Sequence, residues 1–77
     1  MSKLDKKQMG KVNTIAFEIE GFMYEFDATL ANDKSAMLSC ISAIICQFDT
    51  DIAIEVMKKF GKEGENQAMA IKVNYGY

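Results

Sequence analysis

The side chains best suited to chemistry in this sequence are two cysteines and a group of closely spaced carboxylates. Cys40 and Cys46 lie in the apolar segment SAMLSCISAIICQF, residues 35–48. In a helix the two thiols would be separated by about 9 Å along the axis and about 120° around it, which is beyond the reach of a disulfide. They also lack CxxC spacing and neighbouring lysines. We therefore interpret both as buried structural cysteines in a reducing compartment, with a reactive or metal-binding thiol as the alternative.

The residue types that most enzymes use are missing. The chain has no histidine, and its nine basic residues are all lysines. Histidine is the commonest general base at neutral pH and a common metal ligand, and arginine is the usual bidentate clamp for phosphate and carboxylate groups. We therefore expect no enzyme, no cofactor and no metal site.

The segments that must position the carboxylates are VNTIAFEIE, residues 12–20, and FMYEFDATL, residues 22–30. Both alternate apolar and polar residues with a period of two, which is typical of β-strands. Glu20 and Gly21 lie between them and fit a two-residue hairpin turn. With this turn, Phe17 would face Tyr24 and the apolar side chains of both strands would share one face.

The opposite face of the predicted hairpin is acidic. One interpretation is a solvated outer face, as is normal for one side of an antiparallel sheet. The other, which the site prediction adopts, is a patch that binds a basic partner, with a weak divalent-cation site as its variant. The residues predicted to bind the partner are Glu18, Glu20, Met23, Glu25 and Asp27.

Two helices are predicted in the middle of the chain. Residues 35–47 are apolar almost all around a helical wheel, with Asn32 or Asp33 as the N-cap. Residues 50–60 carry an apolar stripe with spacing i, i+4, i+8.

The sequence also indicates where the second helix begins and ends and what structure follows it. Asp49 or Thr50 can cap the start of the helix, and Gly61 follows its end. Residues 62–66 form a polar loop, and residues 67–77 alternate again as a third strand.

The resulting order is ββααβ. This predicts an α+β fold, a three-stranded antiparallel or mixed sheet with two helices packed on one face. Residues 1–11 would form a Lys-rich arm and residues 12–77 a single domain, as expected for 77 residues. The longest apolar run, residues 43–46, is far too short to span a bilayer, and the start of the chain has no secretory signal. We therefore expect no membrane contact and a cytoplasmic protein.

The helix predicted at 35–47 has more apolar surface than one small chain can cover. The hairpin covers one side and the second helix another, so we expect a homodimer, with a compact monomer as the alternative. A row of small side chains would permit close helix approach at that interface: Ser35, Ser39, Ser42 and Cys46. Tyr75 and Tyr77 are a further predicted contact at the terminus.

These features favour a non-enzymatic interaction protein whose target is another protein. It would act as an inhibitor, adaptor or assembly factor, encoded by a phage or mobile element and directed at a host system. The first alternative is an oligomer that binds a nucleotide or metabolite in a pocket between subunits, lined by Tyr24, Ser39, Ser42 or Tyr75. The weaker alternative is nucleic-acid binding through the arm, which carries four lysines without arginine or interleaved aromatic residues and belongs to a chain of net charge −2.

Overall fold

The computed structural model describes residues 4–27 and 31–76, and of Ala31 and Asn32 only the backbone. The described chain is helical. Its elements are α1 (Lys6–Glu25), α2 (Ala31–Cys46), α3 (Thr50–Met57), the 3-10 helix η1 (Lys58–Phe60) and α4 (Gly61–Asn74). No strand occurs within these two ranges, so the predicted ββααβ fold of the α+β class, with its three-stranded sheet, is wrong.

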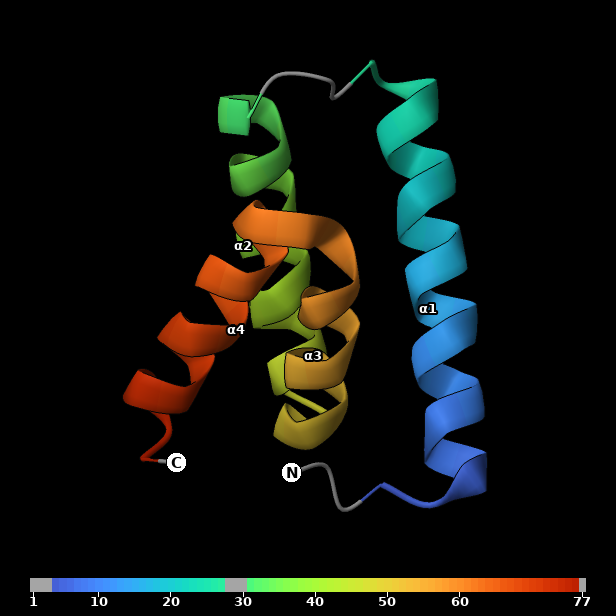
Figure 1. The fold of residues 1–77 in the computed structure, drawn as a ribbon, viewed down its shortest axis with the longest axis vertical. Helices are drawn as coiled ribbons and strands as arrows, with labels where there is room; N and C mark the ends of the chain where they lie inside the picture. The colour runs from blue at the N-terminus through green and yellow to red at the C-terminus, as the bar shows by residue number, and fades with distance from the viewer. Residues whose placement is uncertain (1–3, 28–30, 77) are drawn as a thin grey trace.

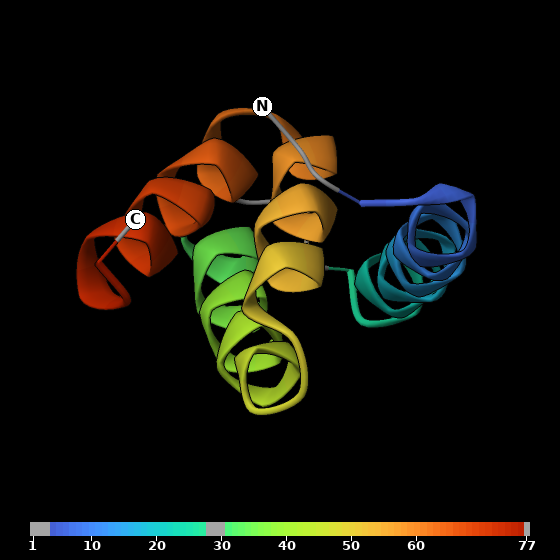
Figure 2. The same ribbon diagram turned by 90° about the horizontal axis from the view of Figure 1, so that it is seen from below.

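The central element is α3, which supplies much of the core. Figure 1 and Figure 2 show α1 on one side of α3, and α2 and α4 on its other sides. The close helix contacts are α3 with each of the other three helices and α2 with α4, whereas α1 with α2 is not among them in the described residues. The buried side chains of α3 are Ile52, Ala53, Ile54, Val56 and Met57.

The first predicted hairpin strand, and the second as far as Glu25, belong to the single helix α1. Its buried residues are Val12, Ala16, Ile19 and Met23. Their spacing of four, three and four is the stripe of a helix that packs on one side. Gly21 lies inside the helix, so the predicted turn is absent there. Residues 28–30, the end of the second predicted strand, lie outside the described residues.

The start of α1 replaces most of the predicted arm. The Asp5 carboxylate accepts a hydrogen bond from the Gln8 backbone N–H at 2.8 Å, and the Gln8 side-chain oxygen accepts one from the Asp5 N–H at 3.1 Å. This reciprocal capping box satisfies two donors that a helix start otherwise leaves free. Leu4 and Met9 also pack against the core. Residues 6–11 are therefore helical, and residues 1–3 lie outside the described part of the chain.

The predicted loop at 62–66 and residues 67–74 of the predicted third strand are part of α4. The helix buries Gly64, Ala68 and Ile71, again at spacings of four and three. Met69 and Val73, which alternate with smaller or polar residues in the predicted strand, are exposed. Gly61 has a φ of 67°, a conformation that favours glycine, and it turns the chain from η1 into α4.

The two predicted helices are confirmed. The helix expected at 35–47 is α2, and the one expected at 50–60 is α3 with η1. Asp49 caps α3, because its carboxylate accepts a hydrogen bond from the Ile52 backbone N–H at 3.2 Å. The helix α2 begins four residues before Ser35, at Ala31, so Asp33 lies in its first turn and is not its N-cap.

Candidate functional site

The acidic surface predicted for a sheet is not formed. Met23 is buried in the core, where no partner can reach it. Glu18 and Glu25 lie close together around α1, seven residues apart, whereas Glu20 is about 160° away from Glu18. Asp27 follows the end of the helix with a φ of 52°. These carboxylates therefore do not share one face.

The predicted row of small residues on α2 is partly covered within the chain. Ser42 is 5% exposed, and its hydroxyl donates a hydrogen bond to the Ser39 carbonyl oxygen at 2.9 Å. Ser35 and Cys46 are half-buried, and Ser39 is exposed. Because Ser42 is buried in the fold, the row cannot serve as a continuous contact surface between subunits.

Cys46 and Tyr75 form a contact between α2 and the end of α4. Burial raises the pKa of the Cys46 thiol, and a side-chain hydrogen bond with Tyr75 acts in the opposite direction. Tyr75 thus has a partner inside the chain, although its ring is half exposed. Both cysteines are free thiols, but Cys40 is exposed, which corrects the prediction that both are buried. Tyr77 lies outside the described residues.

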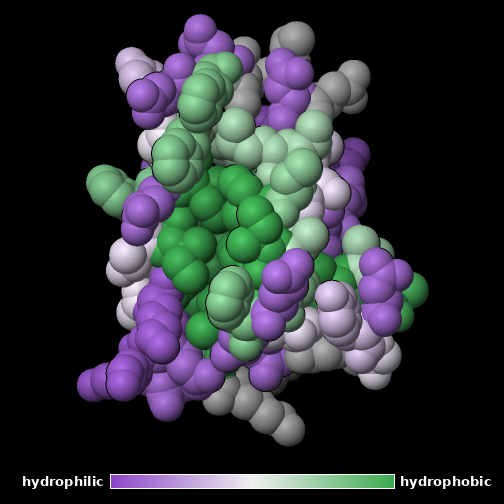
Figure 3. Space-filling view, turned by 180° about the vertical axis from the view of Figure 1, so that it is seen from behind, coloured by the Kyte–Doolittle hydropathy of each residue, from purple (hydrophilic) through white to green (hydrophobic). Residues whose placement is uncertain are grey.

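Apolar side chains of α1 and α2 gather on the same side of the molecule. Figure 3 shows them as a broad hydrophobic patch on the side turned away from the viewer in Figure 1. On α1, Phe22 and Phe26 stack with ring centroids 6.4 Å apart, and the two residues are 49% and 68% exposed. We define the apolar face by the half-buried and exposed apolar residues whose positions around each helix place them on this side: Ile15, Phe22 and Phe26 of α1, Met37, Ile41, Ile44 and Ile45 of α2, and Phe48, which follows α2.

A second aromatic surface lies on the other side of α1. Phe17 and Tyr24, seven residues apart, are 76% and 87% exposed. They lie about 180° around the helix from Phe26. We call them the outer aromatic pair. The helix α1 therefore presents aromatic rings to solvent on both sides of its buried stripe.

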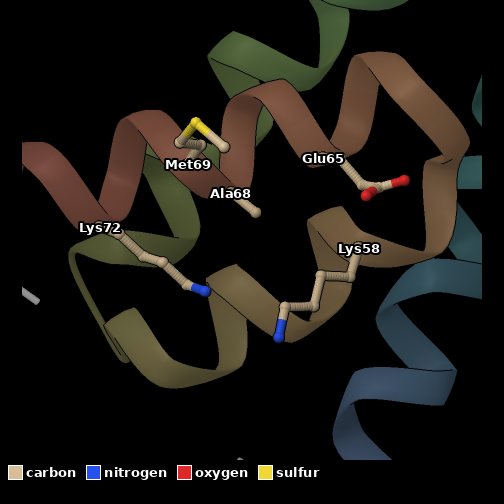
Figure 4. Close-up of a pocket in the computed structure, with 5 residues that line it drawn as sticks. All are labelled: Lys58, Glu65, Ala68, Met69 and Lys72. Carbon is tan, nitrogen blue, oxygen red and sulfur yellow. The ribbon is translucent and has the colours of Figure 1, made fainter. Parts of the chain in front are cut away.

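Two cavities open on other parts of the surface. One, of about 510 Å³, lies between α1, α2 and the turn into α4, and Tyr24 and Lys34 are among the residues that line it. The other, of about 290 Å³, lies beside α4. In Figure 4 the Lys58 and Lys72 side chains incline toward each other over this second cavity, and the Glu65 carboxylate points away. The Lys58 ammonium group already pairs with the Glu55 carboxylate at 3.2 Å.

The ligand pocket predicted between subunits has lining residues that do not share either of these two cavities in one chain. Tyr24 lines the larger of these cavities, but Ser39, Ser42 and Tyr75 line neither of them. Among the described residues, His, Cys, Asp and Glu form no group of three that could hold a metal ion. In the same residues, no helix combines the length and hydropathy needed to cross a bilayer. Comparisons with known protein families, curated proteins and solved structures give no match.

The apolar face was missed in the sequence because Phe22 and Phe26 were assigned to a sheet core. A local signal could have revealed it. The stretch Asp5-Lys6-Lys7-Gln8 has the spacing of a capping box and marks a helix start. From that start, a period of 3.6 residues places both rings beside the buried stripe instead of within it.

Proposed function

We propose that this chain is a small non-enzymatic interaction protein that acts by binding another protein through the exposed apolar side chains of α1 and α2. The observation that carries the proposal is that α1 exposes aromatic rings on both of its sides, Phe22 and Phe26 on one and Phe17 and Tyr24 on the other. Soluble monomers rarely expose large contiguous apolar patches, and aromatic residues are enriched in protein interfaces.

The role that fits such a chain is that of an inhibitor, adaptor or assembly factor in the cytoplasm. Two free cysteines support a reducing compartment. The lack of histidine and arginine supports a function without catalysis. A phage or mobile-element origin, with a host protein as the target, remains part of the proposal on the basis of the lysine-rich, arginine-free composition alone.

Two matched variants test the proposal. F22S/F26S removes two rings from the apolar face, and F17S/Y24S removes two rings from the outer aromatic pair. Because all four side chains are exposed on one helix, both variants are expected to fold. We expect a protein that co-purifies with the wild type from the native host to be lost from at least one variant. Retention of the same protein by both variants would contradict the proposal.

The comparison between the variants also locates the binding surface. A target that is lost only from F17S/Y24S requires the outer aromatic pair, and one that is lost only from F22S/F26S requires the apolar face. Circular dichroism of each variant checks that the helices are intact. A wild-type protein that retains no partner at all would also count against the proposed function.

A further inference from the structure

The charged residues of α1 are separated by sign along the helix. All its basic residues, Lys6, Lys7 and Lys11, lie in the N-terminal half, and all its acidic residues, Glu18, Glu20 and Glu25, lie in the C-terminal half. The helix dipole favours the opposite order, with acidic residues at the start and basic residues at the end. None of these six residues has an opposite charge three or four positions away, where helical ion pairs form. The order therefore costs stability within a single α1.

Four of these charges form one edge of the apolar face. Lys7, Lys11, Glu18 and Glu25 fall within about 40° around the helix axis, next to the positions of Ile15 and Phe22. All four are exposed. The apolar face is therefore bordered along α1 by an edge that is basic at one end and acidic at the other.

Two copies of such an edge have complementary charges when they run in opposite directions. If two α1 helices lie antiparallel, Lys7 of one copy can meet Glu25 of the other, and Lys11 can meet Glu18. The midpoints of these two pairs fall at about positions 16 and 14–15, so that one rotation axis near Ile15 serves both pairs. The same register places Phe26 over the partner's Leu4, a half-buried apolar residue.

We propose that the apolar face is the contact between two copies of this chain, related by a two-fold axis near Ile15 with their α1 helices antiparallel. This rests on the proposed function, since it assigns the apolar face its occupant. The same rotation lays α2 over the partner's α2 and covers Ile44 and Phe48, which a single chain leaves exposed. It also places each end of α1, where the charges oppose the helix dipole, beside opposite charges from the second copy.

The size of the face suits a dimer. The molecule extends 33 × 25 × 20 Å, and the apolar face belongs to its broadest side. A side of that size offers a footprint on the order of the ~800 Å² per partner that a standard interface buries. Phe17 and Tyr24 point away from this contact, so that the dimer keeps both outer aromatic pairs open to a different protein.

Charge reversal tests the dimer directly. K7E/K11E and E18K/E25K each give α1 one sign of charge along the edge, so that two identical copies repel. We expect the wild type to sediment at twice its 8.6 kDa and each variant as a monomer, with dimer affinity lowered at least tenfold. An equimolar mixture of the variants is expected to restore a dimer that contains one copy of each.

Loss of the fold cannot explain this result. K7E/K11E puts acidic residues near the start of α1, where the helix dipole favours them, so the isolated helix should become more stable. K62E/K72E is the matched control, because it changes the net charge by the same amount on α4 and should leave the dimer intact. A monomeric wild type, a charge-reversed variant that dimerises as the wild type does, or a mixture that stays monomeric would overturn the proposed dimer.

The dimer and the proposed function can fail separately. A wild-type monomer that still loses its target when aromatic side chains are removed would refute the dimer and support the function. In the converse case, the wild type is a dimer, the mixture of charge-reversed variants dimerises, and both aromatic variants retain the target. That result would support the dimer and refute the binding of a target through these rings.

Discussion

At Gly64, the helix α4 packs closely against the end of α3. A Cβ atom at this position would overlap the Met57 carbonyl oxygen and lie 2.7 Å from the Phe60 Cβ. Backbone cannot yield as a flexible side chain does, so we expect Gly64→Ala to lower the free energy of unfolding by about 3 kcal/mol. Gly10→Ala is the control. Open space surrounds Gly10, so Gly10→Ala should raise the free energy of unfolding, measured with urea, by about 0.5–1 kcal/mol. Equal stability of G64A and the wild type would contradict this close approach.

The two cysteines should differ in their reaction with alkylating reagents. The reactive form is the thiolate, and burial raises the pKa of the Cys46 thiol, whereas Cys40 is exposed. In the native protein we expect C46A, which retains only Cys40, to be alkylated faster than C40A, and the difference should disappear in denaturant. The raised pKa also means that the unfolded chain releases this proton first as the pH rises through the ordinary range of a cysteine. Any stability contributed by the neutral Cys46 thiol should therefore be lost at alkaline pH. Equal native alkylation rates would contradict the burial of Cys46.

At the scale of the elements, Gly21 distinguishes the helix α1 from the hairpin that the sequence indicated. In a helix with open space around this position, Gly21→Ala should raise the free energy of unfolding by roughly 0.5–1 kcal/mol. In a two-residue hairpin turn, the same change would place alanine where a positive φ is needed and lower the stability. Thermal unfolding of G21A, followed by circular dichroism, gives the sign. A lower melting temperature would contradict the helix.

The same elements show what the sequence could predict. α2 and α3 were recognised because their length, apolar content and the cap at Asp49 all indicate a helix. α1 was assigned to strands because large apolar residues, such as Phe17 and Tyr24, alternate with small or polar ones along the sequence. These two large residues are exposed, whereas the buried stripe contains the small Ala16. An alternating pattern indicates a strand only when the alternating residues are the buried ones. The predicted acidic surface was wrong for the same reason as the predicted hairpin, since residues that share a face of a sheet do not share a side of a helix.

At the scale of the whole molecule, α1 is the element that depends most on a single neighbour. Its close packing within the described chain is with α3, whereas α2, α3 and α4 all contact one another. An element with few neighbours can open without unfolding the rest. A second copy on the apolar face would supply α1 with the contacts that its own chain does not provide.

This dependence predicts a hydrogen-exchange pattern that changes with protein concentration. Because a second copy binds only folded α1, dimerisation should suppress the opening of that helix by mass action. We expect amides of α1 to exchange more slowly when the concentration rises roughly a hundredfold through the dimer range, whereas those of α3 exchange at nearly the same rate, since they are protected in the monomer as well. In K7E/K11E, the α1 amides should exchange independently of concentration. If exchange in wild-type α1 is also independent of concentration, α1 is not the helix through which two copies meet.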